Sequence, residues 1–144
     1  MTRAPFNVLI IPYRLKAGIH EYAAFHRSDV DMWQFIAGGG EDDEAPLATA
    51  IREANEEAGI DQDAGWTALD ASASIPRNAF PGAHWPADIF VITEHSFAVR
   101  AQDTDIRFSH EHDWVEWLDY DTAAMRLTWD SNRVALWELR ERLR

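Results

Sequence analysis

Residues 38–60, which read GGGEDDEAPLATAIREANEEAGI, constrain the fold more than any other stretch. Their three leading glycines follow the short apolar segment 32–37, and glycine allows positive φ angles and a close approach of other groups to the backbone. Pro46 fits the first turn of a helix, and Gly59 fits the residue that closes one. The stretch therefore predicts a glycine loop followed by a helix over 46–58.

The predicted helix has two unlike faces. At about 100° per residue, its apolar side chains fall on one stripe that must face a core: Leu47, Ala50, Ile51, Ala54 and Ala58. On the far side, a wedge of like charges that repel at helical spacing contains Glu53, Glu56 and Glu57. The helix alone leaves two interpretations open. The wedge is either a solvated face or a site for a divalent cation, because Mg²⁺ and Mn²⁺ prefer carboxylate oxygens.

The spacing of the charged residues is regular. Five residues separate Gly38 from Glu44, and seven more lead to Arg52 and Glu53. This pattern resembles the signature of the Nudix hydrolases, G-x5-E-x7-R-E-U-x-E-E-x-G-U, where U is a bulky apolar residue. Every fixed position is filled, with Ala54 as a small residue at the first U. The resemblance implies an α+β fold, an α/β/α sandwich with a mixed β-sheet packed between helices, and a Mg²⁺-dependent hydrolase that cleaves a diphosphate linkage.

The resemblance also implies a metal site made of oxygen ligands. Glu53, Glu56 and Glu57 would bind Mg²⁺, or Mn²⁺, with the backbone carbonyl near Gly38 as a neutral ligand. Family members commonly recruit a further acidic residue from outside the motif, and Glu111 in the segment FSHEHDWVEWL is the candidate. A general base must take a proton from the attacking water, which is otherwise a poor nucleophile. Glu53 and Glu111 are both candidates for that base.

Other polar residues near this site have supporting roles. Arg52 would orient the glutamates as part of the catalytic group, and Gly59 would close the helix. Glu44 would either hold the loop at the helix N-terminus or contact the metal. His110 and His112 are expected to be surface or hydrogen-bonding histidines, because an oxygen-rich site favours Mg²⁺ or Mn²⁺ over Zn²⁺.

Outside the motif, the chain alternates between apolar and turn-forming segments. Strands are predicted over 6–15, 18–27, 65–74, 88–99 and 113–120, and an amphipathic helix over 130–144. Residues 77–87, which contain two prolines and a glycine, form a loop. The length of 144 residues suits a single domain over 1–144.

Five side chains outside the motif are candidates for substrate binding. Arg27 and Arg77 either meet a phosphate or form surface salt bridges. Phe80 and Trp85 either stack on a planar ring, as aromatic side chains do with bases, or pack their own loop. Trp33 precedes the glycines and is a further candidate.

Two segments point to a substrate class. DMWQFIAGG and WDSNRVALWELRERL resemble parts of the dihydroneopterin triphosphate pyrophosphohydrolases. This resemblance implies a nucleoside triphosphate or dihydroneopterin triphosphate as substrate. A Trp-Gln pair also occurs in dinucleoside polyphosphate hydrolases, so that class stays open. A catalytically silent nucleotide-binding or regulatory module is a further alternative, although none of the motif glutamates is degraded.

Composition limits the partners and the location. A formal net charge of −12 argues against stable binding to nucleic acid or an anionic membrane, and leaves a small phosphorylated compound as the partner. No apolar run approaches the roughly 20 residues of a membrane span. The absence of cysteine is compatible with a reducing cytoplasm. A homodimer is compatible with the sequence.

Overall fold

The computed structural model describes residues 2–102 and 104–144. The elements in chain order are β1 (Arg3–Lys16), β2 (Ile19–Arg27), β3 (Trp33–Gln34), β4 (Ile36–Glu41), α1 (Pro46–Ala58), β5 (Trp66–Pro76), the 3₁₀ turn η1 (Arg77–Ala79), β6 (Val91–Arg100), β7 (His112–Leu118), α2 (Tyr120–Arg126) and α3 (Asp130–Arg142). The strand order is β3-β2-β1-β6-β5, with β4 added against β1 and β7 against β2. β1 and β6 are parallel, whereas β1 and β2 are antiparallel, so the sheet is mixed.

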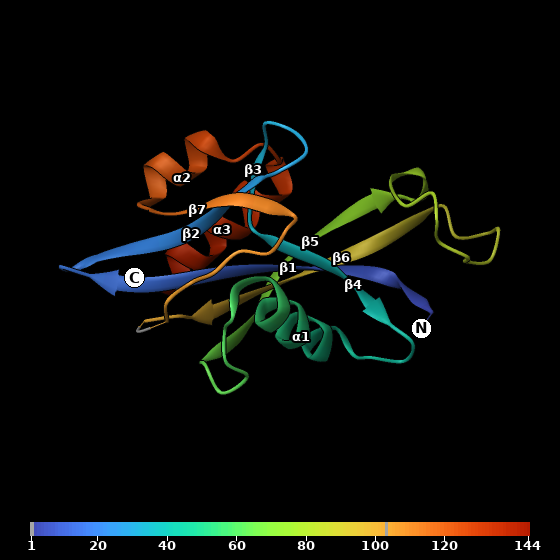
Figure 1. Cartoon of the computed structure of the whole chain (residues 1–144), viewed down its shortest axis with the longest axis horizontal. Coiled ribbons are helices and arrows are strands. Elements are labelled where there is room, and N and C mark those ends of the chain that lie inside the picture. The colour runs from blue at the N-terminus through green and yellow to red at the C-terminus, as the bar shows by residue number, and fades with distance from the viewer. Residues whose placement is uncertain (1, 103) are drawn as a thin grey trace.

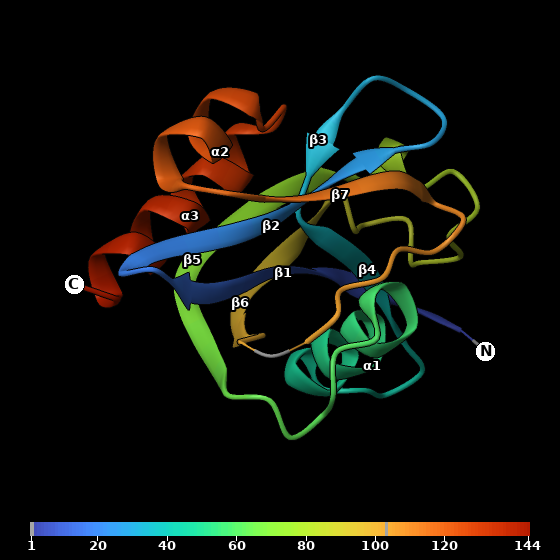
Figure 2. The same ribbon diagram turned by 60° about the vertical axis from the view of Figure 1, so that its left-hand side comes forward.

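The helices cover opposite faces of this sheet, with α1 on one face and α2 and α3 on the other (Figures 1 and 2). Side chains of β1 alternate between the two faces, as the pleat of a strand requires. Val8 and Ile10 belong to the core under α1, and Leu9 and Ile11 belong to the core under α3. The predicted α/β/α sandwich with a mixed sheet is confirmed. Within the described residues, no helix is long and apolar enough to cross a membrane.

The helix α2 was not predicted. A strand over 113–120 was expected, but β7 ends at Leu118 and a helix begins at Tyr120. The side chain of Asp119 caps this helix by accepting a hydrogen bond from the Thr122 N–H at 2.9 Å. Asp is a preferred residue at the N-cap of a helix, so Asp119 is a helix-start signal that the sequence does contain.

The glycines of the motif do not form a loop with positive φ, and that prediction was wrong. They lie within β4, and Asp42, with a φ of 53°, makes the turn that follows. Side chains from β1 and α1 occupy the space that a Cβ would need: Arg3 at Gly39, Phe6 at Gly40 and Glu53 at Gly38. The glycines therefore allow side chains of β1 and α1 to pack directly against the backbone of β4. This close approach to the backbone was the second property expected of the glycines.

Candidate active site

Helix α1 presents a different buried stripe from the one expected. Ala50, Ala54 and Ala58 are fully buried, but Leu47 is 44% exposed and Glu57 is only 8% exposed. The helix ends where Gly59 adopts a φ of 71°, which is the left-handed conformation of a C-cap. The acidic wedge is therefore not a uniformly solvated face.

Glu53 is a second acid of the helix that is withdrawn from solvent, although only partly. Its side chain is 14% exposed, and its carboxyl group lies against Gly38, where a Cβ would overlap it. The pKa of Glu53 is raised to about 7, mainly by burial; the charge of Arg52 opposes this effect, and the charges of Glu56 and Glu57 add to it. A carboxyl group with this pKa binds and releases a proton near neutral pH.

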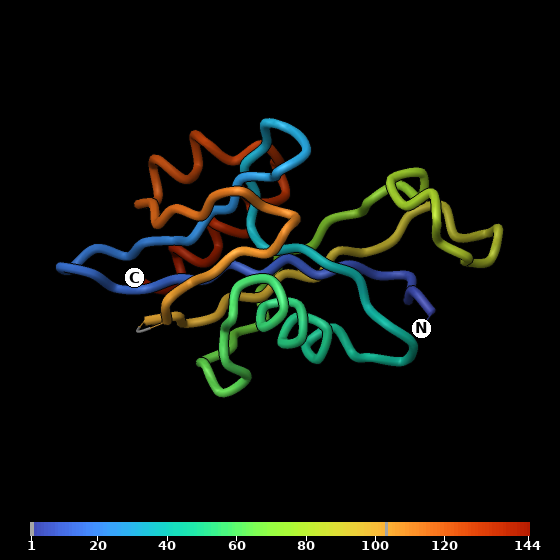
Figure 3. Tube along the Cα trace, in the orientation of Figure 1, coloured from blue at the N-terminus to red at the C-terminus, as the bar shows by residue number. Residues whose placement is uncertain are grey.

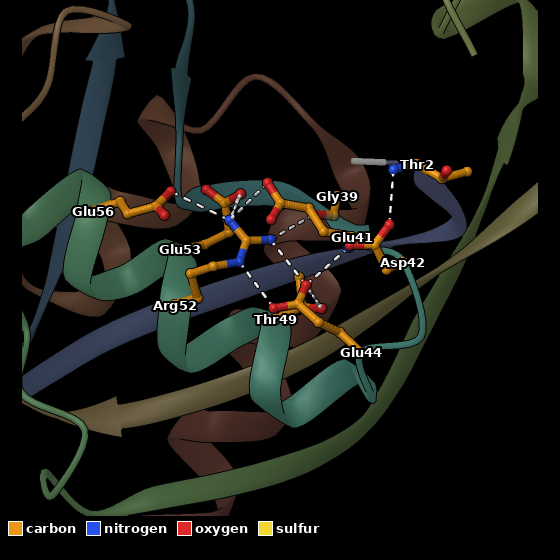
Figure 4. Close-up of polar contacts among 9 residues, drawn as sticks. All are labelled: Thr2, Gly39, Glu41, Asp42, Glu44, Thr49, Arg52, Glu53 and Glu56. Atoms are coloured by element: carbon orange, nitrogen blue, oxygen red, sulfur yellow. Dashed lines mark hydrogen bonds and ion pairs between the residues drawn. The ribbon is translucent and has the colours of Figure 1, made fainter. Parts of the chain in front are cut away.

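Arg52 joins the motif helix to the glycine strand (Figure 4). Its guanidinium donates to the carbonyl oxygen of Gly39 at 3.0 Å, to Glu53 at 3.1 Å and to Glu56 at 3.3 Å. It also makes two hydrogen bonds to Glu44, at 2.9 and 3.0 Å. This geometry suits the predicted role of orienting the glutamates.

Glu44 is held from three sides at the start of the helix. Besides Arg52, it accepts hydrogen bonds from the N–H of Glu41 at 2.8 Å and from the hydroxyl of Thr49 at 2.9 Å. The hydrogen bond from Arg52 is the main reason that the pKa of Glu44 falls to about 2. Of its two expected roles, these contacts fit the structural one, in which Glu44 fixes the turn between β4 and α1.

Glu57 faces the segment before β7. The Ser109 hydroxyl donates a hydrogen bond to its carboxylate, and the Nδ1 atom of His112 lies 3.8 Å from the same oxygen. His112 packs against Phe25, with ring centroids 5.2 Å apart, and neither ring nitrogen has a hydrogen-bond partner among the described residues. The expectation of a surface or hydrogen-bonding histidine was wrong for His112, because the first residue of β7 points into the core.

Glu111 lies two residues from Ser109 on the same turn. Its N–H donates to the Ser109 hydroxyl at 3.3 Å, and its carbonyl accepts from the Ser28 N–H at 3.0 Å. Its exposed side chain lines a cavity of about 680 Å³, which Gly38 also lines. One turn therefore contains both Ser109, which is hydrogen-bonded to Glu57, and Glu111, which lines the cavity.

The remaining wall of this cavity comes from both halves of the sheet and from the start of α3. It includes Asn7 and Leu9 of β1, Ala73, Ser74 and Ile75 of β5, Glu94 of β6, and Trp129, Ser131 and Asn132 at α3. A volume of several hundred Å³ with apolar walls and a few polar groups is typical of a small-molecule site.

A metal ion fits the chemistry of these residues, although the carboxylates are not gathered around one point. Over residues 2–102 and 104–144, no three acidic or histidine side chains form a metal-ligating group. The reason is that the Arg52 guanidinium lies between Glu53 and Glu56, while Ser109 engages Glu57. An all-oxygen donor set suits Mg²⁺ or Mn²⁺. Burial raises the pKa of the Glu53 carboxyl, and a bound divalent cation would act in the opposite direction by favouring the charged form.

The candidates for substrate binding divide into two groups. Arg27 and Phe80 line the cavity, whereas Trp33, Arg77 and Trp85 do not. Arg27 makes a bidentate ion pair with Asp29, in which Nε and Nη2 donate to the two carboxylate oxygens at 2.8 and 2.7 Å. It therefore forms a surface salt bridge and also borders the cavity.

The three candidates outside the cavity have packing roles. Arg77 donates to backbone carbonyls across the loop between β5 and β6, which projects from the sheet (Figure 3). Trp85 is buried, and its Nε1–H donates to the carbonyl of Arg3 at 2.8 Å. The Trp33 ring centroid lies 5.2 Å from that of the His26 ring and 5.0 Å from the guanidinium carbon of Arg126. For these three, the contacts fit a structural role, and substrate contact stays a prediction.

Two polar residues of the cavity were missed by the sequence analysis. Asn7 and Glu94 are both 6% exposed and hydrogen-bonded to each other at 2.6 Å. A signal was present for Asn7, which is a polar residue inside the apolar run of β1, but not for Glu94, which has Thr93, His95 and Ser96 beside it in β6. A third polar residue, Asn132, is buried and accepts the N–H of Phe35 at 2.9 Å.

The fold and the site together define a class of domain in which a glycine-rich strand and an acidic helix flank one ligand cavity. Residues 15–137 match the NUDIX domain family, and the chain belongs to that family. Nudix hydrolases generally use divalent metals, which agrees with the oxygen donors of the helix.

Relatives and solved structures agree with this assignment. The chain is 36% identical over 89 residues to a dihydroneopterin triphosphate diphosphatase of Haemophilus influenzae, which covers 60% of this chain and 56% of that protein. It is also 36% identical over 104 residues to an octanoyltransferase of Myxococcus xanthus, covering 71% of this chain and 27% of that protein. The chain thus spans about a quarter of one curated relative and just over half of the other.

Among solved structures, a Listeria monocytogenes protein assigned to the NUDIX hydrolases has a TM-score of 0.89 and 42% identity, covering 97% of this chain and 94% of that one. The Escherichia coli dihydroneopterin triphosphate pyrophosphohydrolase has a TM-score of 0.77 and 24% identity, covering 94% of each chain. A Caenorhabditis elegans Ap4A hydrolase has a TM-score of 0.75 and 20% identity, covering 97% of this chain and 98% of that one. The last two likenesses establish the fold alone.

Proposed function

We propose that residues 1–144 form one domain that acts as a divalent-metal-dependent pyrophosphohydrolase. Its substrate would be a small compound with a diphosphate linkage, either a nucleoside triphosphate or dihydroneopterin triphosphate. One observation carries the proposal: two acids of α1, the partly buried Glu53 and the buried Glu57, lie against Gly38 and the Glu111 turn, and both of these border the cavity. Burying two acids is costly without a cation or a ligand to compensate their charge.

The residues suggest how the metal would be held. Glu53, Glu56, Glu57 and the carbonyl of Gly38, with Glu111 from the facing turn, would bind Mg²⁺, or Mn²⁺ in its place. When bound, the ion would screen the phosphate oxygens and lower the pKa of a water molecule.

The protein's own groups supply the remaining steps. Glu53, whose carboxyl group lies against Gly38 at the cavity wall, and the exposed Glu111 are the two candidates to take the proton of the attacking water. Arg52 holds the carboxylates of Glu53 and Glu56 in place. Arg27 brings a positive charge to the cavity wall, where it would face the phosphate chain.

A hydrolase for dinucleoside polyphosphates is the second candidate. The same phosphate site serves either substrate, and the C. elegans structural neighbour is an Ap4A hydrolase. A silent binding module is the third. Intact glutamates at every motif position argue against it. We further propose a cytoplasmic location, with which the lack of cysteine is compatible.

The test is a substrate screen of the purified chain with Mg²⁺ and, separately, Mn²⁺. Nucleoside triphosphates, dinucleoside polyphosphates, sugar nucleotides and dihydroneopterin triphosphate are compared by the phosphate or pyrophosphate they release. Glu57→Gln is the inactive control, and Glu21→Gln makes the same change in a surface ion pair with Arg14. If the wild-type chain hydrolyses none of these compounds with either metal, the proposed function is wrong.

A further inference from the structure

The pair formed by Asn7 and Glu94 lies inside the cavity, on the opposite face of the sheet from α1. Asn7 pairs in register with Gly39 of β4 on one side and with Glu94 of β6 on the other. Two steps along β1, Leu9 belongs to the core under α3, so Asn7 points to that face. Strands lie about 4.8 Å apart, which separates Glu94 from the glycine strand by about 10 Å.

The carboxyl group of Glu94 is buried without a positive partner among the described residues. Its Oε2 atom accepts one hydrogen bond, from the Asn7 amide at 2.6 Å, and its Oε1 atom accepts none from the described residues. The guanidinium of Arg3 donates a hydrogen bond to the Asn7 side-chain oxygen at 3.1 Å and none to Glu94 among the described residues. Burial raises the pKa of Glu94, and the bond from Asn7 only partly opposes this. A glutamine or an apolar residue would occupy this position at a lower cost in desolvation, so packing alone does not explain a glutamate.

The surroundings of Glu94 have the shape of a ring-binding site. Leu9, Phe35 and Ile75 give apolar walls, and Phe80 borders the same space beneath the Arg3 guanidinium, which lies 4.6 Å from its ring centroid. Gly38 and Glu111 line the cavity as well, so the ring end and the phosphate end form one continuous space.

We propose that Glu94, oriented by Asn7, is the specificity-determining residue that accepts two N–H donors from the edge of a 2-amino-4-oxopyrimidine ring, as found in guanine and in pterins. Such an edge presents a ring N–H beside an amino group, which matches the two oxygens of one carboxylate. Adenine presents an acceptor beside its amino group and would leave one oxygen facing a lone pair. This inference rests on the proposed function, because it assigns the ring end of the same site.

The first arm of the test uses the wild-type chain alone. With Mg²⁺, kcat/KM is measured for GTP, for ITP, which lacks only the 2-amino group, and for ATP. A charge-assisted hydrogen bond lost at a buried site predicts that GTP is preferred over ITP by about 10-fold to 100-fold. Equal values for GTP and ITP, or a preference for ATP, would overturn the assignment.

The second arm uses Glu94→Gln, which keeps the size of the side chain and replaces one acceptor by a donor. The GTP-to-ITP ratio is expected to fall close to one, mainly through a higher KM for GTP, while Glu21→Gln retains the wild-type ratio. Turnover of dihydroneopterin triphosphate should fall in parallel, because its ring has the same edge. An unchanged ratio in a folded Glu94→Gln protein would contradict the proposal.

A third arm separates this inference from the proposed function. Dissociation constants of GDP and IDP are measured by calorimetry, which requires no turnover. If the chain hydrolyses nothing but binds GDP at least 10-fold more tightly than IDP, the activity is wrong and the role of Glu94 stands. If hydrolysis occurs while GDP and IDP bind equally, the role of Glu94 is wrong and the activity stands.

Discussion

Replacing Gly38 by alanine tests whether the glycine strand and the motif helix act as one unit. A Cβ at residue 38 would overlap the Cγ, Cδ and Oε1 atoms of Glu53, which lie on that side of β4. The Gly38→Ala protein must therefore displace the end of the Glu53 side chain or shift the strand. Displacement would weaken the hydrogen bond from Arg52 to Glu53, which is 3.1 Å long.

The magnitude follows from two contributions. Extra volume in a packed site costs about 1–3 kcal/mol, and a weakened hydrogen bond to a charged group costs about 1.5–3 kcal/mol. If the Glu53 side chain rotates away, the overpacking is relieved but the hydrogen bond is weakened; if it stays, the hydrogen bond is kept but the overpacking remains. Only one of the two costs therefore acts in full, and we expect a loss of about 2 kcal/mol in the free energy of unfolding. In a domain of this size that lowers the thermal midpoint by roughly 4–8 °C. A catalytic group moved by about 1 Å costs about 100-fold in rate, so kcat/KM should fall by that factor.

The assay is a double-mutant cycle by urea unfolding. If the clash acts through Glu53, adding Gly38→Ala to Glu53→Ala should cost less than about 0.5 kcal/mol, which leaves a coupling energy of about 2 kcal/mol. Gly65→Ala is the matched control, because among residues 2–102 and 104–144 its Cβ would meet only Arg100, at an ordinary 3.7 Å. Equal costs of Gly38→Ala with and without Glu53 would refute the reasoning, and so would a Gly38→Ala protein with wild-type kcat/KM.

Three further outcomes follow from the site. Glu57→Gln should lower kcat by about 100-fold or more while the fold survives, and a near wild-type rate in a stopped assay would remove Glu57 from the metal site. Excess chelator should abolish turnover and added Mg²⁺ should restore it, whereas full activity in chelator would argue against a metal. Because burial raises the pKa of Glu94, the native state holds a proton that the unfolded state has released once the pH exceeds about 4.5. The stability that the protonated Glu94 contributes is thus lost as the pH rises from about 4.5 through its folded pKa. Glu94→Gln should therefore gain stability relative to wild type as the pH is raised above 4.5 in ligand-free urea titrations, and a constant difference would contradict this.

Local signals predicted the framework well. The helix over 46–58, its closing Gly59 and the mixed sheet are all confirmed, because each depends on the period of apolar residues or on a residue with a special conformation. The motif spacing further indicated that Arg52 and the glutamates belong together, and they lie within hydrogen-bonding distance of one another.

Contacts between segments distant in sequence could not be predicted from these local patterns. The helical period gives the angle of Glu57 around α1 but not what packs there, and the Ser109 turn that covers it comes from a segment 52 residues away. Periodicity likewise marks Asn7 as an inward residue but does not show that Glu94 faces it across a parallel strand pair. Parallel pairing joins segments distant in sequence, so no local pattern reports it.

The spacing between the glycines and the helix has a physical reason that the structure supplies. The turn after β4 must carry the chain back so that α1 lies beside that strand. Only then does Arg52 reach the carbonyl of Gly39 and the carboxyl of Glu53 lie over Gly38. Adding or removing one residue in this turn would rotate the helix by about 100° relative to the strand and break both contacts at once. The fixed number of residues in the motif is thus the number that keeps Arg52 and Glu53 in contact with the glycine strand. Because Gly38 has no Cβ, it leaves the space that the Glu53 carboxyl group occupies.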